Sequence, residues 1–425
     1  MDVLGEFEWR GLVYDATEGL RDIVAREKLT SYIGFDPTAP SLHVGSLLPM
    51  VSLARLQRSG HPPIAVVGGG TGMIGDPSGK ATERSLLTVE QVETNVVGIR
   101  GQLSLFLDFD DMSTPARVVN NAEWLTKLTA IEFMRDVGKY FTVNYMLAKE
   151  SVKRRSESDE GISYTEFSYL LLQSYDFLVL HDRFQCTLQL GGSDQWGNIT
   201  AGVDLIRRLR GRKVHGLVMP LITTASGAKF GKTEAGAVWL DPKLTSPFRF
   251  YQFWLHTDDT DAGRYLRYFT FLDRATIEQL EEATRNSPES RDAQRALARE
   301  VTRMVHGVDH VMRAERASGV LFGEDIATLP ADDVLSVFDD VPSSTVTADK
   351  LAGEGVAVVD LLATSGLTAS KGEATRLIRG GGVYVNNRRV TDEKARLRSS
   401  DAIDGRLFVL RKGAKQNHVV KIATL

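Results

Sequence analysis

The side chains best suited to chemistry in the first part of the chain fall in one stretch, residues 32–46, which reads Tyr-Ile-Gly-Phe-Asp-Pro-Thr-Ala-Pro-Ser-Leu-His-Val-Gly-Ser. Residues 32–35 are predicted to end a buried strand, residues 36–41 have turn chemistry, and residues 46–59 have the apolar spacing of a helix. In a parallel sheet, such a unit offers the N–H groups of the helix start to an anion at the carboxyl end of the strand. His43 would lie beside that anion. Taken alone, a loop histidine is more often a surface or packing residue, so both interpretations stay open.

Three polar side chains share one face of a helix predicted over residues 165–182. Tyr169, Gln173 and Asp176 are spaced i, i+4 and i+7, so they project from the same side. The helix is apolar around much of its circumference, and a buried polar stripe is costly unless it converges on a polar ligand. The pattern predicts either a ligand site or a face exposed to solvent.

Three further segments have residue types that suit a nucleotide. Residues 68–80 hold so many glycines that their backbone is expected close to a ligand or to other backbone, although they match neither the Walker nor the dinucleotide-binding pattern. Residues 189–198 leave a predicted strand, turn on two glycines and enter a helix, which suits a ribose held by Asp194. Residues 229–233, Lys-Phe-Gly-Lys-Thr, place two lysines in a flexible loop that could grip a triphosphate. As a bare pattern, this last segment equally fits a solvated surface loop.

The alternation of strands and helices defines the expected fold class. Short apolar runs are expected as strands and the segments between them have helical spacing; the strands are placed at 63–67, 116–119, 187–190 and 217–222, and the helices at 89–107, 123–140 and 165–182. This alternation predicts an α/β domain with a Rossmann-like, largely parallel sheet.

The length of 425 residues suggests more than one domain. We expect a Rossmann-like catalytic domain over residues 1–246, an α-helical domain over 247–321 and a small α+β domain over 356–425. Residues 322–355 are rich in Asp, Ser, Thr, Pro and Gly, and are expected to form a linker.

Composition indicates an ordinary globular protein, with 42% hydrophobic and 25% charged residues. The first residues lack the basic and apolar regions of a secretory signal, and no window approaches the ~18 apolar residues of a membrane span. Cys186 is the only cysteine, which excludes an internal disulfide and a cysteine-clustered zinc site. A cytoplasmic protein is therefore expected.

Charge is distributed unevenly along the chain. The net charge is −4, but residues 356–425 contain thirteen Lys or Arg and six Asp or Glu, which makes this part +7 and the rest −11. A compact basic module on an acidic body suggests a polyanionic partner, with a merely solvated basic surface as the alternative.

The motifs together resemble those of a known family. The run over residues 32–45 resembles the first signature of class I aminoacyl-tRNA synthetases, in the form found in bacterial tyrosyl enzymes, with Ser46 where a second histidine or an asparagine is usual. Residues 229–233 resemble the second signature, and the two lie 186 residues apart in the expected order. Residues 359–389, with two short helical patterns, a glycine turn and a basic hairpin, resemble the αL RNA-binding motif.

The resemblance implies activation of L-tyrosine with ATP to tyrosyl-adenylate and pyrophosphate, followed by transfer of tyrosyl to the 3′ end of tRNA(Tyr). It also implies Mg²⁺ bound with ATP, no zinc, no organic cofactor, no membrane partner and a homodimer. A tryptophanyl enzyme or another nucleotidyltransferase is the enzymatic alternative, and an RNA-binding protein without catalysis is the alternative from another class.

The resemblance also assigns site residues. Those expected to act on the α-phosphate and the departing pyrophosphate are Thr38, His43, Lys80, Arg84, Lys229, Lys232 and Thr233. Those expected to bind tyrosine are Tyr32, Asp76, Asn121, Tyr169, Gln173, Asp176 and Gln195. Those expected to bind ATP or the adenylate are Gly34, Asp36, Thr38, His43, Gly45, Ser46, Gly191, Gly192, Asp194 and Lys232. Those expected to contact tRNA phosphates, unless they form only a solvated face, are Lys371, Arg376, Arg379, Arg388 and Arg389.

Overall fold

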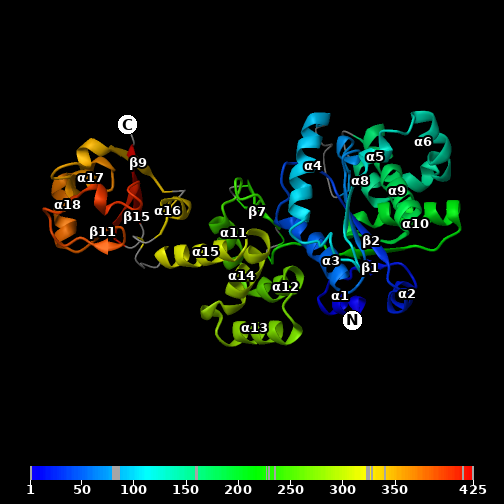
Figure 1. Cartoon of the computed structure of the whole chain (residues 1–425), viewed down its shortest axis with the longest axis horizontal. Helices are drawn as coiled ribbons and strands as arrows, with labels where there is room; N and C mark the ends of the chain where they lie inside the picture. The colour runs from blue at the N-terminus through cyan, green and yellow to red at the C-terminus, as the bar shows by residue number, and fades with distance from the viewer. Residues whose placement is uncertain are drawn as a thin grey trace. The chain divides into compact units, whose positions relative to one another are not determined.

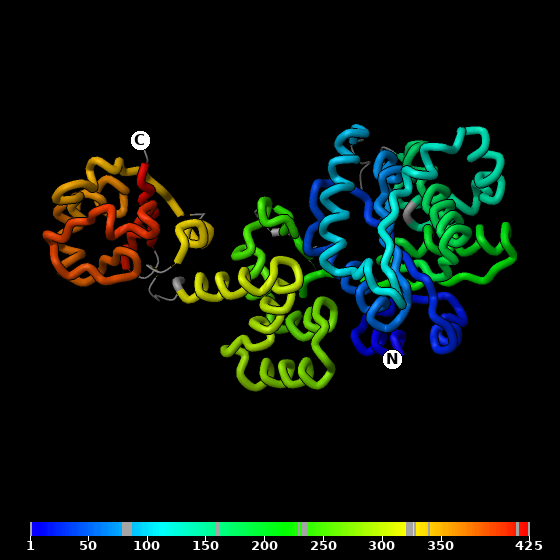
Figure 2. The backbone as a smooth tube through the Cα atoms, viewed as in Figure 1, coloured from blue at the N-terminus to red at the C-terminus, as the bar shows by residue number. Residues whose placement is uncertain are grey.

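The chain divides into two compact units, shown with their helices and strands in Figure 1 and as a backbone trace in Figure 2. The computed structural model describes residues 2–78, 87–157, 161–225, 227, 230–233, 236–321, 326, 329–338, 341–413 and 416–423. The first unit comprises Met1–Leu244 with Trp254–Val305, and the second comprises Thr245–Phe253 with His306–Leu425.

A six-stranded sheet lies at the centre of the first unit, in the order β1-β6-β5-β2-β3-β4. Its strands, in chain order, are β1 (Asp15–Ala16), β2 (Thr30–Phe35), β3 (Pro63–Val67), β4 (Arg117–Asn120), β5 (Cys186–Gly192) and β6 (His215–Met219). All neighbouring strands are parallel except β1, which pairs antiparallel with β6. Every residue of β3 and β6 is buried, as expected of strands covered on both faces by helices. The predicted α/β fold with a largely parallel sheet is confirmed.

The helices of this unit either follow the strands or pack over their connections. They are α1 (Val3–Trp9), α2 (Leu20–Arg26), α3 (Leu47–Arg58), α4 (Val89–Leu103), α5 (Ala122–Leu125), α6 (Ala130–Asp136), α7 (Val143–Leu147), α8 (Glu150–Ser156), α9 (Tyr164–Phe184) and α10 (Trp196–Arg210). The helix α9 begins where the Ser163 side chain accepts a hydrogen bond from the Glu166 N–H, and it ends at Gln185 in a left-handed conformation. It packs along α10, and its Phe177 and Leu180 join Tyr32 and Ile64 in the core beside the sheet.

The helical region expected over residues 247–321 is present, but it is divided between the two units. Its helices are α11 (Pro247–Leu255), α12 (Asp259–Phe269), α13 (Arg274–Asn286), α14 (Asp292–His306) and α15 (Val308–Leu321). α12 and α13 lie wholly within the first unit, together with α14 up to Val305, and α15 belongs to the second. Helical periodicity detects these helices, whereas their partners depend on tertiary packing that periodicity does not encode.

A five-stranded sheet organises the second unit, in the order β12-β11-β14-β15-β9. Its strands are β9 (Ser343–Thr347), β11 (Val383–Val385), β12 (Arg388–Arg389), β14 (Leu407–Lys412) and β15 (Gln416–Ala423), and its helices include α16 (Ala331–Val337), α17 (Val358–Thr364) and α18 (Lys371–Arg379).

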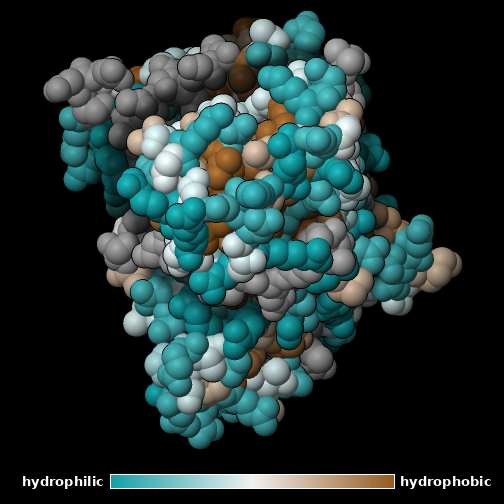
Figure 3. All heavy atoms as spheres, turned by 90° about the vertical axis from the view of Figure 1, so that its left-hand side faces the viewer, coloured by the Kyte–Doolittle hydropathy of each residue, from teal (hydrophilic) through white to brown (hydrophobic). Residues whose placement is uncertain are grey.

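The face of the molecule in Figure 3 is mainly hydrophilic, with hydrophobic side chains visible in patches between polar ones.

The linker expected over residues 322–355 requires correction. Its described residues include α16 and β9, and β9 pairs in parallel with β15 as an edge strand of the sheet. Only Val346 is buried in β9, so the strand has little of the apolar alternation that identifies strands in a sequence. Its backbone pairing to β15 places it in the folded unit.

In the described ranges, no helix is both long and apolar enough to cross a lipid bilayer.

Candidate active site

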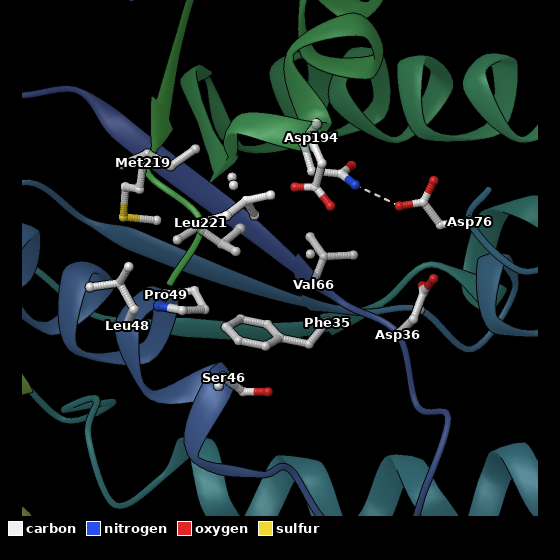
Figure 4. Close-up of a pocket in the computed structure, with 18 of the residues that line it drawn as sticks. Phe35, Asp36, Ser46, Leu48, Pro49, Val66, Asp76, Asp194, Met219 and Leu221 are labelled. Atoms are coloured by element: carbon white, nitrogen blue, oxygen red, sulfur yellow. Dashed lines mark hydrogen bonds between the residues drawn. The ribbon is translucent and has the colours of Figure 1, made fainter. Parts of the chain in front are cut away.

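A cavity of about 620 Å³ opens at the carboxyl ends of the central strands of the first unit. Its walls come from β2 and the loop after it, the segment after β3, one face of α9, and the ends of β5 and β6. The crevice at the carboxyl edge of a parallel sheet is the usual ligand position in such folds. In Figure 4, Asp36 and Asp76 lie on the same side of this cavity, and Ser46 lies beside Phe35.

The loop after β2 holds His43 in a fixed orientation. The His43 Nδ1 accepts a hydrogen bond from the Gly45 N–H at 3.0 Å, which leaves Nε2 as the N–H of a neutral ring. A Cβ on Gly45 would lie 2.6 Å from His43 Cε1, so glycine is required for this contact. A short 3₁₀ turn, Val44–Ser46, precedes α3, so the helix begins one residue later than predicted.

The two signature segments meet in the folded chain. Gly231 has a φ of +81°, and a Cβ on it would lie 2.8 Å from Val44 Cγ2. The Val44 N–H donates to the Val238 carbonyl at 2.9 Å, and His43 forms an antiparallel bridge with Trp239. The Lys-Phe-Gly-Lys-Thr segment therefore lies against the loop that carries His43, as two cooperating signatures require.

Asp36 is held by side chains from two distant parts of the chain. The Thr71 hydroxyl donates to Asp36 Oδ1, and the Tyr169 hydroxyl donates to Asp36 Oδ2, each at 2.9 Å. Burial raises the pKa of Tyr169 well above its usual value, and the negative charge of Asp36 raises it further. The Asn121 Nδ2 donates to the Thr71 hydroxyl at 2.9 Å, which connects this group to the next.

Asp176 is a buried carboxylate with two donors. The Asn121 Nδ2 donates to Oδ2 at 2.9 Å, and the Trp124 Nε1 donates to Oδ1 at 2.7 Å. Burial raises the pKa of Asp176 to about 7, although both hydrogen bonds oppose this shift. The nearby Tyr32 hydroxyl is buried and has no hydrogen-bond partner among the described residues. The cavity thus offers a carboxylate and a phenolic hydroxyl to a ligand.

A chain of amides orients Asp76. The Gln195 Nε2 donates to Asp76 Oδ2 at 2.5 Å, the bond dashed in Figure 4, and the Gln173 Nε2 donates to Gln195 Oε1 at 3.2 Å. The Asn198 Nδ2 in turn donates to Gln173 Oε1 at 3.0 Å. The Ser78 N–H donates to Asp76 Oδ1 at 2.9 Å. These contacts fix a carboxylate beside α9, where a ligand ammonium could approach it.

Most of the residues predicted from the sequence line this one cavity. They are Tyr32, Gly34, Asp36, Thr38, His43, Gly45, Ser46, Asp76, Asn121, Tyr169, Gln173, Asp176, Gly191, Gly192, Asp194 and Gln195. Lys80, Arg84 and Lys229 lie outside the described residues. The backbone of Lys232 and Thr233 forms β7, which pairs antiparallel with β8 (Gly236–Ala237).

Sequence reasoning missed several residues of the site. Thr71 and Trp124 hold Asp36 and Asp176 respectively, and Gln189 and Phe230 line the cavity. Thr71 lies in the glycine-rich stretch and Gln189 opens the second strand-turn-helix segment, so both were near a detected motif. No local pattern identifies Trp124, because its role depends on a contact with a helix far along the chain.

The residues predicted to meet tRNA lie in the second unit. Lys371, Arg376 and Arg379 are exposed on α18, and Arg388 and Arg389 are exposed on β12. Lys371 pairs with Asp360 at 2.7 Å and Arg379 pairs with Glu393 at 2.6 Å. Exposed ion pairs of this kind contribute little to stability, so phosphates can compete with Asp360 and Glu393 for these basic side chains.

Within the described parts of the chain, no three His, Cys, Asp or Glu side chains gather as a metal-binding group.

Two family models and several known proteins match the chain. Residues 25–323 match the model of class I tRNA synthetases (W and Y), and residues 333–420 match the model of the tyrosine--tRNA ligase SYY-like C-terminal domain. The chain is 58% identical to the tyrosine--tRNA ligase of Roseiflexus castenholzii, covering 99% of both chains, and 50% identical to that of Bacillus caldotenax, covering 100% of both. It also resembles the C-terminally truncated mitochondrial tyrosyl-tRNA synthetase of Aspergillus nidulans, with a TM-score of 0.67 and 32% identity over 76% of this chain and 94% of that one.

The chain therefore belongs to the class I tRNA synthetase family of the W and Y type. The relatives that match it over its full length are bacterial enzymes named tyrosine--tRNA ligase.

Proposed function

We propose that the chain is a tyrosine–tRNA ligase, which forms tyrosyl-adenylate and pyrophosphate from L-tyrosine and ATP and then transfers tyrosyl to the 3′ end of tRNA(Tyr). The observation that carries this proposal is the buried Asp176 carboxylate, held by Asn121 and Trp124 in a cavity that the unpartnered Tyr32 hydroxyl also lines. A phenol both donates and accepts a hydrogen bond, so it can satisfy both groups. An indole offers one N–H donor and no acceptor, which disfavours tryptophan.

The amino group of tyrosine fits the polar face of α9. Asp76 would bind the ammonium, with Gln173 and Gln195 holding that carboxylate in place. The Tyr169 hydroxyl donates a hydrogen bond to Asp36, so the lone pairs of the Tyr169 oxygen can accept a hydrogen bond from the ammonium. Asn121 donates hydrogen bonds to Thr71, which holds Asp36, and to Asp176. It therefore supports both the ammonium end and the phenol end of the proposed tyrosine site.

The nucleotide would occupy the carboxyl edge between the two signature segments. Gly191, Gly192 and Asp194 line the cavity; the two glycines would let backbone approach the adenylate, and Asp194 would bind the ribose. Thr38 and His43 would contact the α-phosphate, and Ser46 can donate a hydrogen bond to a nucleotide oxygen without carrying charge. The residues expected to stabilise the departing pyrophosphate are Lys80, Arg84, Lys229, Lys232 and Thr233.

Both steps require positioning more than covalent catalysis. In the first, the tyrosine carboxylate attacks the α-phosphorus of ATP and the bond to pyrophosphate breaks. In the second, a hydroxyl of the terminal adenosine of tRNA attacks the tyrosyl carbonyl and AMP leaves. Neither step needs a covalent enzyme intermediate, so alignment and charge stabilisation account for the acceleration.

Mg²⁺ would arrive with ATP and neutralise part of the triphosphate charge. Two carboxylates of the cavity, Asp36 and Asp76, already accept hydrogen bonds from protein donors. This arrangement fits an ion held mainly by phosphates and water rather than by a protein cage.

The proposal extends to the partners and the location of the protein. The basic side chains on α18 and β12 would contact tRNA phosphates. Exposed hydrophobic side chains on α6, α7 and the start of α9 would form a homodimer contact; they are Ile131, Met134, Val143, Leu147 and Tyr164. Because tRNA charging serves protein synthesis, the proposed location is the cytoplasm.

Charging of a tRNA(Tyr) transcript with labelled tyrosine, phenylalanine or tryptophan tests this function. We expect acid-precipitable tyrosine and no measurable charging with the other two amino acids. Charging with tryptophan in preference to tyrosine would contradict the assignment of Tyr32 and Asp176.

A further inference from the structure

Three side chains of α12 contact the segment that leads into the second signature. The Asp261 Oδ2 accepts a hydrogen bond from the Ala225 N–H at 2.8 Å. The Arg264 Nη2 donates to the Thr223 carbonyl at 2.7 Å and also bonds to Asp261 Oδ1. The Tyr265 hydroxyl donates to the same Thr223 carbonyl at 3.3 Å. The chain is therefore bound to α12 a few residues before Phe230.

Asp261 is unusual among the carboxylates of α12 because its side chain is only 6% exposed. Burial of a carboxylate costs stability unless its oxygens accept hydrogen bonds. One oxygen of Asp261 accepts a hydrogen bond from the Ala225 N–H of the loop, and the other accepts one from Arg264 of the same helix. The burial of Asp261 thus depends on the loop being in place.

Phe230 gives the same segment a second attachment. Its ring is 5% exposed and stacks on Phe269 of α12 with centroids 5.3 Å apart. It also meets the edge of Tyr265 at 5.0 Å and the ring of Trp254 at 5.7 Å. The burial of Phe230 therefore holds the segment on α12 two residues before Lys232.

The opposite end of α12 is attached to α3, the helix that follows His43. The Arg55 Nη2 donates to the carbonyls of Arg267 and Thr270, at 3.0 and 2.6 Å. Arg10 Nη1 donates to the same two carbonyls, at 2.8 and 3.2 Å. Cationic donors at a helix carboxyl end are favourable, and Arg55 is 5% exposed. One helix therefore contacts both signature-bearing parts of the first unit.

We propose that Asp261, with Arg264 and Tyr265, is a positioning residue for adenylate formation, which holds the entry of the Lys-Phe-Gly-Lys-Thr segment on α12 and thereby sets where Lys232 meets the phosphates. This inference rests on the proposed tyrosine–tRNA ligase function. Asp261 does not line the cavity, so it would act on the reaction only through the loop backbone that it holds.

The decisive test is a double-mutant cycle on the rate of adenylate formation in single turnovers, with tyrosine affinity measured separately. Asp261→Ala removes the acceptor for Ala225, and we expect adenylate formation to slow roughly tenfold while tyrosine affinity stays within about twofold. In a Lys232→Ala background the same change should have almost no further effect, because the group that Asp261 positions is absent. A tenfold loss in both backgrounds, or an equal loss of tyrosine affinity, would overturn the proposal.

A matched control and a milder variant keep the test informative if Asp261→Ala folds poorly. Asp292→Ala removes an aspartate that pairs with Arg295 three residues on, at the start of α14, and it should leave the rate unchanged. Tyr265→Phe keeps the aromatic packing and removes one donor to Thr223, so a slowing of about threefold is expected, again absent with Lys232→Ala. An unchanged rate in folded Tyr265→Phe would contradict the role of this contact.

Hydrogen exchange of peptides over residues 223–232 gives a readout that does not depend on activity. Asp261→Ala should speed exchange of the Ala225 amide, and Asp292→Ala should not. Unchanged exchange in Asp261→Ala would overturn the anchoring itself. If the wild-type protein forms no adenylate while this exchange pattern holds, the failure belongs to the proposed function and not to the anchor.

Discussion

At the scale of single residues, the cavity combines carboxylates held by protein donors with a hydroxyl that lacks one. Asp36 and Asp76 accept a hydrogen bond from the protein at each oxygen and keep further acceptor capacity, whereas the Tyr32 hydroxyl is buried without a partner among the residues that the structure describes. A buried polar group without a hydrogen bond costs stability, so its presence in a cavity points to a ligand that satisfies it.

Tyr32→Phe should separate stability from binding. Removal of the unsatisfied hydroxyl should raise the free energy of unfolding without ligand by about 1 kcal/mol, because a desolvated group is lost and no protein hydrogen bond breaks. Tyrosine affinity should fall by roughly five- to tenfold, since the phenol loses one partner. Urea unfolding and equilibrium dialysis measure the two effects. A variant that is less stable and binds tyrosine as well as the wild type would show that this hydroxyl has a different role.

Asp176 should make stability depend on pH. Its pKa in the folded chain is about 7, above the ordinary value of 3.8, so the folded state holds the proton more tightly than the unfolded state. The contribution of Asp176 to the free energy of unfolding is therefore fully present below about pH 4. It is lost as the pH rises through about 7 and stays lost at higher pH. Relative to Asp176→Asn, the wild type should lose about 2 kcal/mol of unfolding free energy between pH 5 and pH 8.

Asp182→Asn is the control for this pH effect, since Asp182 lies on the same helix with its side chain 38% exposed and paired with Arg210. It should follow the wild-type pH profile. If Asp176→Asn also follows that profile, Asp176 is not the titrating group.

At the scale of elements, α9 carries the polar face of the site and must be held in register. Its first turn is fixed by an ion pair between Arg155 of α8 and Glu166, with side chains 2% and 3% exposed and atoms 2.9 Å apart. Removal of one partner from a buried pair leaves an uncompensated charge. The same helix presents Tyr169, Gln173 and Asp176 to the cavity, so its placement affects binding as well as folding.

Glu166→Gln should lower the free energy of unfolding by about 3 kcal/mol, because the charged hydrogen bond from Arg155 to a buried carboxylate becomes one to a neutral amide. Glu150→Gln is the matched control on α8: its pair with Arg154 is exposed, with side chains 86% and 66% accessible, and its loss should cost less than about 0.5 kcal/mol. Denaturant unfolding of both variants measures the difference. Equal effects would show that the buried pair adds nothing specific.

The sequence predicts elements best where local chemistry determines them. Spacing predicts the loop after β2 and places Tyr169, Gln173 and Asp176 on one face of α9, but it leaves open whether they form a site or a surface; in the structure both line the cavity. Thr71 and Trp124 could not be found in this way, because each matters through one hydrogen bond to a distant carboxylate. Asp261 is another such case, since an aspartate near a helix start has an ordinary explanation as a residue that favours the helix dipole.

The division of the chain was harder to predict than its secondary structure. The composition around β9 predicts a linker and only one residue of the strand is buried; its strand character comes from backbone pairing with β15, where Ser343 pairs with Val419. The helices α12 and α15 lie in one predicted helical region but belong to different units. Tertiary contacts, which a single sequence does not display, decide which strand pairs with β9 and which unit each helix joins.

At the scale of the whole molecule, we propose tyrosine and ATP chemistry in the first unit and RNA contacts at the basic side chains of the second. Exposed hydrophobic side chains on α6, α7 and α9 form the surface that we propose for self-association. Ile131, on α6, is 68% exposed and belongs to the set of exposed apolar side chains on α6, α7 and the start of α9.

Light scattering should therefore give a mass of twice the 46.9 kDa of one chain. Ile131→Asp should shift the protein toward monomer, because a charge would be buried at the contact. Val97→Asp is the control, since Val97 on α4 is 73% exposed but lies outside this surface. A monomeric wild type, or a dimer insensitive to Ile131→Asp, would contradict the proposed contact.

The most direct test of the central proposal is tyrosine-dependent exchange of labelled pyrophosphate into ATP without tRNA, with phenylalanine and tryptophan as controls. We predict exchange with tyrosine alone, which would establish adenylation and amino-acid selection in a site that has Ser46 in place of the usual residue. Absence of exchange by folded protein, or exchange driven equally by phenylalanine, would contradict the assignment of this cavity as a tyrosine-activating site.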